Sequence, residues 1–515
     1  MHPLTCEPIN GKHKHVRKEL AAFLPTELGQ PRRARMGYDA ARDTEGWQSY
    51  WANADRRDAD SQNSRAVREK LVPRSRYETE SNGYYAGIIT THVNMLVGVG
   101  PTLRMLTGSR NFNQTVEREW YAWTQRVQLR RKLWCMAHAR TADGEGFAVL
   151  QTNPGLPADG VQLDLTLLET EQCQTPNLPF TAGYIDGIRF DEFGNILWYD
   201  VLPEHPGTDR ALLSSADAIR VPAEDMLHWF KMRRPGQHRS GPELASTLNI
   251  GAARRRFSEA TVRTAEIAAA HSVMLETQMT ADDADAAEPM STFPISHGMF
   301  TALPMNYKAS QMKAEHPNST YSDFLRSLIS EQSRPLSMPY NAAACDSSTY
   351  SFASGKLDTL CYRAALDVER SDCNDLVLTR IFSAWFKEWT IVARAESFTP
   401  NHQWDWPQHP VIDAVQEATA IDTKLKNGTV SLRQTYSDAG KDYEDELAVM
   451  AEDTFGIADE ETIEKMRKIQ VLRNTPAPAM PFVAQVLGLE SPEAAEPTPQ
   501  PIGAPADEPE PAAVA

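Results

Sequence analysis

The longest helix-forming stretch, which decides the architecture, is residues 241–276: GPELASTLNIGAARRRFSEATVRTAEIAAAHSVMLE. It is rich in alanine, and Pro242 suits the first turn of a helix because that turn needs no backbone N–H donor. The segment therefore predicts a helix from Pro242 to about residue 275. A second helix is expected at 320–334, and the two would flank an irregular stretch, 279–319, that holds several prolines and acids.

Amphipathic periodicity predicts further helices on both sides of this pair. Asn82-Gly83 fits either a turn or the N-terminal boundary of a helix, and Gly98-Val99-Gly100-Pro101 ends the run that follows it. Asn427-Gly428 ends the last of these helices, with lysines favourably placed in its final turn. The expected helical ranges are 64–71, the run around 88–97, 112–140, 353–390 and 413–427.

The periodicity changes between residues 145 and 231, where apolar residues alternate or run together as they do in strands. The segment GYIDGIRFDEFGNILWYDVL predicts a hairpin around the turn pair Gly194-Asn195. The apolar run MLHWF at 226–230 predicts another strand. A β-rich region between helical ones gives the fold class α+β, mainly helical.

Composition narrows the class of protein. The chain has 515 residues, 41% of them apolar, enough for sizeable cores and, at roughly 100–200 residues per domain, for two to four domains. No run approaches the roughly 18 apolar residues of a membrane span, and the basic N-terminus lacks the apolar core of a signal peptide. The six cysteines form neither a CxxC pair nor a dense disulfide framework, so we expect reduced thiols and no association with a membrane.

The net charge of −17 is unevenly distributed along the chain. Residues 1–35 carry seven Lys or Arg against three acids, whereas residues 431–515 carry 17 acids against six bases. Such an acidic protein is a poor candidate for tight, wrapped binding of DNA, because neutralising phosphates requires Lys and Arg. It remains compatible with a protein that lets DNA pass without gripping it.

No catalytic motif is found in the sequence. The nearest approach to a phosphate-binding loop is Gly355-Lys356, but Tyr350 and Leu357 stand where the pattern requires Gly and Ser or Thr. There is no HExxH, no GxSxG and no GxGxxG opening a helix, and the histidines are scattered. We therefore expect no enzyme activity, no cofactor and no metal site, and a structural or assembly role instead.

Seven segments between about residues 35 and 450 carry recognisable motifs, including Gly144-Glu145-Gly146 ahead of a strand and an Arg-Pro-Gly-Gln-x-Arg signature that ends at Arg239. They are GYDAAR (37–42), VREKLVPRSRYETESNGYYAGIITTHVNMLVGVGPTLR (67–104), ARTADGEGFAVL (139–150), LDLTLLETEQC (163–173), HWFKMRRPGQHRSGPELASTL (228–248), HPNSTYSDFLRSLISEQSRPLSMPYNAAACDSSTYSFASGKLD (316–358) and AVQEATAIDTKLKNGTVSLRQTYSDAGKDYEDEL (414–447). In this order they resemble the lambda-type family of portal proteins of tailed bacteriophages. Ser240 interrupts the expected Arg-Gly pair, and Lys356 stands where many relatives carry arginine.

The resemblance implies a ring, usually a dodecamer, at one vertex of the capsid, through which double-stranded DNA is packaged and ejected. It implies that the partners are other copies of the chain, the terminase large subunit, the head–tail adaptor and a major capsid or scaffold protein. The protein would act in the virion and, during assembly, in the host cytoplasm.

The resemblance also implies a division into a wing, a stem, a clip and a crown. The expected parts are a basic N-terminal arm (1–63), the wing (64–241), a stem helix (242–278), the clip (279–319), a returning stem helix (320–334), a channel loop (335–352), a long wing helix with the C-terminal part of the wing (353–450), a helical crown-like region (451–490) and a disordered tail rich in Pro and acids (491–515).

A simple estimate agrees with a ring of this size. A duplex of about 10 Å radius, a few Å of water and half of a helix about 10 Å wide place the stem axes about 18–20 Å from the centre, so a circumference of about 120 Å holds roughly twelve helices. In such a stem, Arg254, Arg255 and Arg256 are expected to bridge to acids of the next subunit. The alternative is an ordinary amphipathic helix in a globular core.

The expected channel loop is uncharged at most positions and its side chains are mostly small to medium. Such groups touch DNA weakly, whereas charged ones would bind phosphates and slow translocation. Asp346 would add repulsion, and an acidic lumen would keep the duplex away from the wall. The alternative is a surface connector. The expected DNA-facing residues are Ser337, Met338, Tyr340, Asn341, Ser347, Ser348 and Thr349.

Two other classes of protein compete with this interpretation. A terminase subunit would need the phosphate loop that is missing. A head-completion adaptor is generally much shorter, and a major shell protein would lack the paired stem-like helices.

Overall fold

The computed structural model describes residues 46, 49–175, 183–208, 218–270, 274–277, 307–310, 321–395, 398–407, 414–438 and 443–475, together with 480, 482, 483 and 487. The chain divides into two compact units, Met1–Asp58 and Ala59–Ala515, and the elements below belong to the second. Most of the expected N-terminal arm and clip, and the whole Pro-rich tail, lie outside the described residues. No helix in the described ranges is long and apolar enough to cross a membrane.

The second unit opens with α3 (Ala59–Gln62), α4 (Arg65–Ser81) and α5 (Gly83–Val97). Asn82 separates the last two: its backbone N–H closes the end of α4, and its side chain accepts a hydrogen bond from the backbone N–H of Tyr85 (3.4 Å). The pair Asn82-Gly83 is therefore a helix boundary, because a polar Asn side chain satisfies one of the free N–H groups of the first turn. The predicted helix at 64–71 is confirmed, but it continues through Pro73 to Ser81.

The prediction of one helix over 112–140 is wrong, because two helices occupy this range: α6 (Arg110–Arg126) and α7 (Leu129–Asp143). The helical conformation is interrupted at Gln128, whose φ of 53° lies in the left-handed region. The break allows Trp123 of α6 to bury its ring and to donate from Nε1 to the carbonyl of Leu163 (2.9 Å). Periodicity missed the break because the apolar stripes of the two helices follow one another without a gap.

The β-rich region expected between 145 and 231 is confirmed. An antiparallel sheet orders β3 (Leu163–Leu168), β2 (Glu145–Thr152) and β8 (Met226–Phe230). A second antiparallel sheet orders β4 (Tyr184–Ile185), β5 (Ile188–Phe190), β6 (Ile196–Val201) and β7 (Ile219–Pro222). The hairpin of β5 and β6 turns at Gly194-Asn195, as expected.

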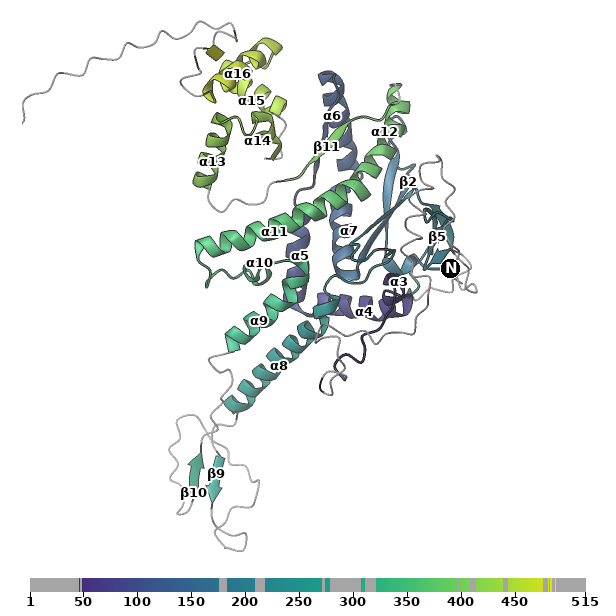
Figure 1. Cartoon of the computed structure of the whole chain (residues 1–515), viewed down its shortest axis with the longest axis vertical. Helices are drawn as coiled ribbons and strands as arrows, with labels where there is room; N and C mark the ends of the chain where they lie inside the picture. Colours follow the sequence, from purple (N-terminus) through teal and green to yellow (C-terminus); the bar gives the residue numbers. More distant parts are fainter. Residues whose placement is uncertain are drawn as a thin grey trace, which may run out of the picture. The chain divides into compact units, whose positions relative to one another are not determined.

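The long helix predicted from Pro242 begins later and ends earlier. The 3-10 turn Ala245–Thr247 leads into α8 (Leu248–Ala270), and Met274–Thr277 form β9, which pairs antiparallel with β10 (Tyr307–Ser310) (Figure 1). Residues 242–244 are not helical because they are bound to other elements; for example, the backbone N–H of Glu243 donates to the carbonyl of Thr141 (3.1 Å). The strand β9 escaped prediction because its residues pair with residues 30 to 36 positions further along the chain.

The helix predicted at 320–334 is confirmed as α9 (Tyr321–Ser333). It packs on α8 through aromatic rings, with Phe257 at 5.7 Å from Tyr321 and 5.3 Å from Phe324. Gly251 lies at the closest approach, since a Cβ there would stand 2.7 Å from the amide nitrogen of Gln332.

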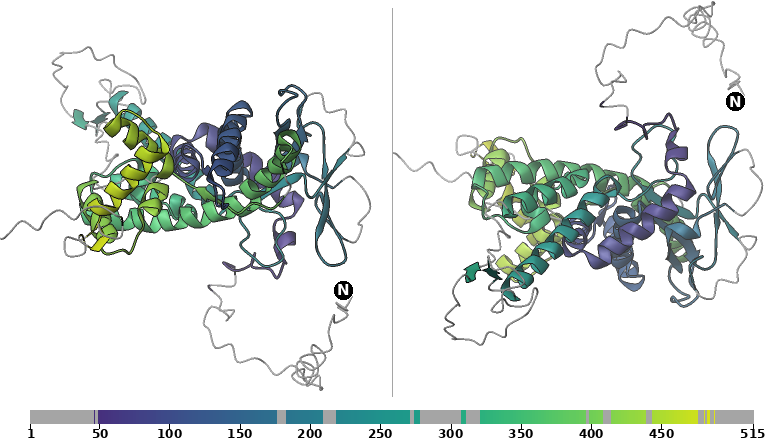
Figure 2. Two further views of the ribbon diagram at one scale, coloured as in Figure 1. Left: turned by 90° about the horizontal axis from the view of Figure 1, so that it is seen from above. Right: turned by 90° about the horizontal axis from the view of Figure 1, so that it is seen from below.

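The expected loop at 335–352 is partly helical, with a 3-10 turn (Arg334–Leu336) and the short α10 (Tyr340–Ala344). The helix predicted at 353–390 is confirmed as α11 (Phe352–Cys373) and α12 (Thr379–Ala393), joined without a break by the π-helical turn Asn374–Leu378. Figure 2 shows α11 and α12 as one long green helix.

The main core lies where α5, α6, α7 and α12 meet β2, β3 and β8, and it is rich in tryptophan. A two-stranded sheet of β1 (Thr102–Met105) and β11 (His402–Asp405) flanks it. The tryptophan side chains buried there are Trp120, Trp123, Trp229, Trp385, Trp389 and Trp404.

The C-terminal part is helical: α13 (Ala414–Lys426), α14 (Leu432–Asp438), α15 (Tyr443–Phe455) and α16 (Glu460–Arg473). The first of these confirms the helix predicted at 413–427. Tyr443, Leu447, Ala451 and Met466 form a small core of their own.

Candidate functional site

A buried ion pair fixes the sheet to the segment that leads into α8. The guanidinium of Arg239 donates from Nε and Nη2 to the carboxylate of Glu145 (2.9 and 2.8 Å), and both side chains are at most 1% exposed. The backbone N–H of Ser240 adds a third donor to this carboxylate (2.7 Å). Burial by itself raises the pKa of Glu145, but the charge and hydrogen bonds of Arg239 hold that pKa well below its ordinary value.

The glycines beside this pair are required by close backbone contacts. Gly144, at φ 103°, ends α7, and a Cβ on it would lie 2.2 Å from the carbonyl carbon of Gly241. A Cβ on Gly146 would lie 2.6 Å from the carbonyl oxygen of Met136. The Gly144-Glu145-Gly146 motif and the Arg239-Ser240-Gly241 motif, nearly 100 residues apart, thus form one joint.

A second buried network centres on Glu369 of α11. Its carboxylate accepts a hydrogen bond from Lys231 (2.8 Å), lies 3.1 Å from Nε2 of His92 on α5, and forms an ion pair with Arg140 of α7. Arg140 also pairs with Glu243, just before α8 (2.9 Å). Burial by itself raises the pKa of Glu369, but the His92 hydrogen bond and the Arg140 charge hold it far below its ordinary value. The network thereby joins α5, α7 and α11 to the start of α8.

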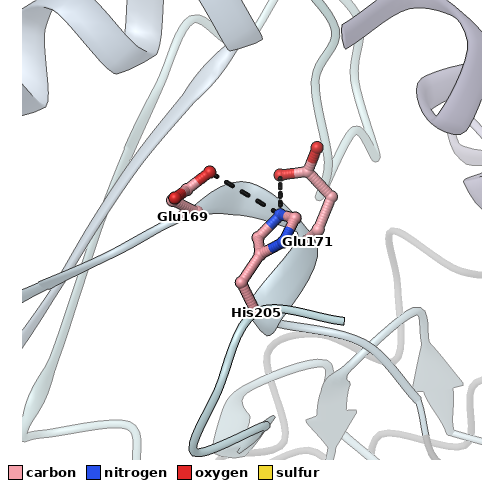
Figure 3. A group of neighbouring side chains, drawn as sticks. All are labelled: Glu169, Glu171 and His205. Atoms are coloured by element: carbon pink, nitrogen blue, oxygen red, sulfur yellow. Dashed lines mark ion pairs between the residues drawn. The ribbon is translucent and has the colours of Figure 1, made fainter. Parts of the chain in front are cut away.

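Among the described residues, the group that could hold a metal ion is Glu169, Glu171 and His205 (Figure 3), with Nε2 of His205 3.6 Å from each carboxylate. Arg76 already pairs with both carboxylates, at 3.1 and 2.9 Å. The backbone N–H of Gly207 donates to Nδ1 of His205 (3.0 Å), so the neutral ring carries its proton on Nε2. That nitrogen then faces the carboxylates as a donor and offers no lone pair to a metal ion. With both carboxylates paired to Arg76, the group is better described as an ion-paired cluster than as a metal site.

The residues expected to face DNA fall into three groups. Ser337, Ser347, Ser348 and Thr349 are exposed, and Tyr340 and Asn341 are half-buried. Met338 is 3% exposed and packs in the main core, which removes it from the set that could touch DNA.

This loop is held to α9 by a cation–π contact that the sequence analysis missed. The guanidinium of Arg326 lies over the rings of Tyr340 (4.7 Å) and Tyr350 (5.6 Å). The hydroxyl of Tyr340 donates to Asp346 (3.3 Å), which in turn accepts from the backbone N–H of Ser348 (2.9 Å). The tyrosines at both ends of the loop were the available signal, but nothing local pointed to an arginine 14 residues upstream of the first.

The three arginines expected to bridge subunits have different surroundings. Arg254 is buried, donates to the side chain of Asn82, and lies over the Tyr84 ring (4.5 Å). Arg255 lies 3.5 Å from Glu78 and over a tyrosine ring. Since both arginines are bound within their own chain, Arg256, which is exposed, remains the candidate for contact with another subunit.

Paired long helices, short antiparallel sheets and two buried charge networks make up this architecture. A family model described as "Phage portal protein, lambda family" matches residues 42–370. The chain therefore belongs to the lambda family of phage portal proteins, and its role is that of a head–tail connector in the virion.

The chain is also similar to solved structures of gene transfer agent (GTA) particles. The neck of an empty particle, computed with C6 symmetry, is 13% identical over 71% of this chain and 94% of the other, with a TM-score of 0.45. The virion of a native particle is 12% identical over 72% and 93% (TM-score 0.40), and the neck of a native particle, computed with C12 symmetry, is 13% identical over 71% and 92% (TM-score 0.43). No curated protein matches the chain.

Glu145→Ala should lower the free energy of unfolding by about 3–5 kcal/mol, because it leaves the guanidinium of Arg239 buried without a counter-ion. Urea unfolding followed by circular dichroism measures this. Asp422→Ala is the matched control, since Asp422 pairs with Lys426 at 2.7 Å on the surface and should change stability by less than about 1 kcal/mol. Equal effects of the two substitutions would contradict the role given to the buried pair.

The same pair predicts a pH dependence. Because the pKa of Glu145 is lower in the folded state than its ordinary value of 4.5, its contribution is complete above that value and is lost as the pH falls through the lowered pKa. The stability difference between wild type and Glu145→Gln should therefore be constant near neutral pH and narrow as the pH drops below about 4.5. A difference that widened on acidification would be inconsistent with an ionised Glu145.

Arg326→Ala should release residues 340–350 from α9. Two cation–π contacts, each of about 0.5–1 kcal/mol, correspond to a loss of protection of roughly tenfold. Hydrogen exchange read by mass spectrometry measures this, and Arg118→Ala, at an exposed position of α6, is the control. Unchanged exchange in the loop of Arg326→Ala would show that other contacts hold it.

Proposed function

We propose that about twelve copies of this chain assemble into a ring at one vertex of a phage capsid, and that double-stranded DNA passes through the ring during packaging and ejection. The family match over residues 42–370 carries this proposal. The partners would be the terminase large subunit, the head–tail adaptor and a major capsid or scaffold protein. No reaction is assigned to the chain, in keeping with a structural family.

The helices α8 and α9 are the proposed stem, which would surround the DNA. With 23 residues, α8 is about 35 Å long at 1.5 Å per residue. The close approach at Gly251 and the stacked ring of Phe257 hold the two helices together as a rigid pair. The strands β9 and β10, which follow α8 and precede α9 in the chain, would belong to the clip and pair with neighbouring subunits there.

The residues between α9 and α11 are the proposed channel loop. Ser347, Ser348 and Thr349 are exposed, uncharged and small, which suits a sliding contact with phosphates. Between Pro335 and Phe352 the charged residue is Asp346, so this stretch itself carries no positive charge, although the exposed Arg334 precedes it. Because Arg326 of α9 contacts Tyr340 and Tyr350 of the loop, the loop would follow any movement of the stem.

The size of the purified chain tests the assembly. Sedimentation should show a particle of about 690 kDa for twelve copies of the 57.5 kDa chain, with no hydrolysis of ATP. A protein that stayed at 57.5 kDa under all assembly conditions, or that hydrolysed ATP unaided, would instead favour another component of the packaging machinery.

Ser347→Lys should slow DNA packaging, because in a ring of about twelve copies it places as many positive charges around the duplex. Ser383→Lys adds the same charge on an exposed position of α12 and should package normally. The measurement is the amount of DNA protected from nuclease per particle over time. Normal packaging by Ser347→Lys would exclude this loop from the channel wall.

A further inference from the structure

The outer side of α4 carries a row of basic and aromatic side chains. Lys70, Arg74 and Tyr77 follow one another at spacings of four and three residues, which place them on one face of the helix. All three are exposed, Tyr77 by 58%. The opposite face, with Val72 and Ser75, is buried against α5 and α7, and α4 lies beneath these helices in Figure 1. The exposed row is named here the α4 ridge (Lys70, Arg74 and Tyr77).

The two cations of the α4 ridge are available to an anion. Lys70 and Arg74 form no ion pair with any residue that the structure describes. Arg255 of α8, by contrast, lies over the Tyr77 ring (5.1 Å) and 3.5 Å from Glu78. An ammonium and a guanidinium one helical turn apart, next to an exposed ring, therefore form a surface to which a carboxylate-bearing segment can bind.

The carboxylates near the α4 ridge lie beside it and not on it. Glu69 pairs with Arg65, one turn earlier on the helix (2.8 Å). Glu80 is exposed at the C-terminal edge of the ridge, and Glu259 of α8 lies 3.9 Å from Arg255. A long duplex, whose charge is spread over its whole length, would be repelled by these acids, so the ridge suits a short acidic segment better.

The end of this chain has the complementary composition. Residues 491–515, which lie outside the described residues, contain five acids, seven prolines and no Lys or Arg. Acids and prolines alternate most closely in DEPEP, residues 507–511. Carboxylates form charge-assisted hydrogen bonds with Lys and Arg, and proline-rich segments dock on exposed aromatic rings. The α4 ridge offers a partner for both kinds of residue.

We propose that the acidic, proline-rich segment 491–515 docks on the α4 ridge, with carboxylates against Lys70 and Arg74 and a proline ring against Tyr77. Its 25 residues extend over at most about 80 Å. The contact can form within one chain or between copies, so it does not depend on the proposed ring. It would cover cations that otherwise bind the phosphates of passing DNA.

A labelled synthetic peptide of residues 491–515 tests the contact directly. The receptor is the full chain with the five acids of its own segment 491–515 replaced by Gln or Asn, so that the ridge is unoccupied. The peptide should bind this protein, and Lys70→Glu/Arg74→Glu in the same chain should weaken binding about tenfold, as the loss of two ion pairs predicts. Fluorescence anisotropy gives the affinities.

The matched control for the ridge variant is Arg118→Glu/Arg126→Glu, which makes the same change of charge at exposed positions of α6. It should bind the peptide as tightly as the unsubstituted receptor. Because all four side chains are exposed, both variants should keep the circular dichroism spectrum and melting temperature of the wild type. Equal weakening by the two variants would mean that the peptide responds only to net charge, and the proposed contact would be wrong.

Affinity for DNA measures whether the segment covers the ridge in the intact chain. Replacing the five acids should raise the affinity for a labelled duplex of about 30 base pairs about threefold or more, the change expected if the segment occupies the ridge two thirds of the time. The rise should disappear in Lys70→Glu/Arg74→Glu and persist in Arg118→Glu/Arg126→Glu. A rise of the same size in all three backgrounds, or no rise in any, would overturn the inference and leave the proposed ring untouched.

Discussion

Two carboxylates buried in an ionised form, Glu145 and Glu369, determine how the parts of this fold are joined. Each is far from water and is kept charged by an arginine that comes from a distant segment, Arg239 and Arg140 respectively. A buried charge without its partner is costly, by several kcal/mol, so each carboxylate requires its arginine in one position. The sheet, three helices and the segment ahead of α8 are therefore fixed relative to one another by charge as well as by apolar packing.

This constraint bears directly on the proposed channel. The helix α8 leaves the joint through Glu243, and α11 returns to it through Glu369; Arg140 contacts both carboxylates. Between these two anchored points lie α9 and the loop with exposed serines, held by Arg326. The loop that would touch DNA is thus polar and interacts weakly, while the segments on either side of it are anchored by buried ion pairs. A passive conduit needs this combination, since its wall must keep its shape without retaining the duplex.

Local signals were sufficient for much of the fold. Amphipathic periodicity placed α9 and α13, alternation placed the β5–β6 hairpin, and a short apolar run placed β8, because in these elements the pattern and the boundary residues agree. The failures share a physical cause: the break at Gln128, the late start of α8 and the short α10 all depend on partners distant in sequence. Glu145 lies in the Gly144-Glu145-Gly146 motif and Arg239 ends the Arg-Pro-Gly-Gln-x-Arg signature, yet nothing in the sequence spacing of the two residues indicates that they pair. Arg254 and Met338 were assigned to surfaces because burial cannot be read from an arginine or a methionine alone.

The proposed function requires identical chains that close around an axial hole wide enough for duplex DNA. Electron microscopy of the purified assembly, viewed along its axis, tests this most directly. We expect top views with one rotational symmetry close to twelvefold and a central opening of at least about 20 Å, the diameter of the duplex. Closed particles without an opening, or open chains of variable length, would contradict it.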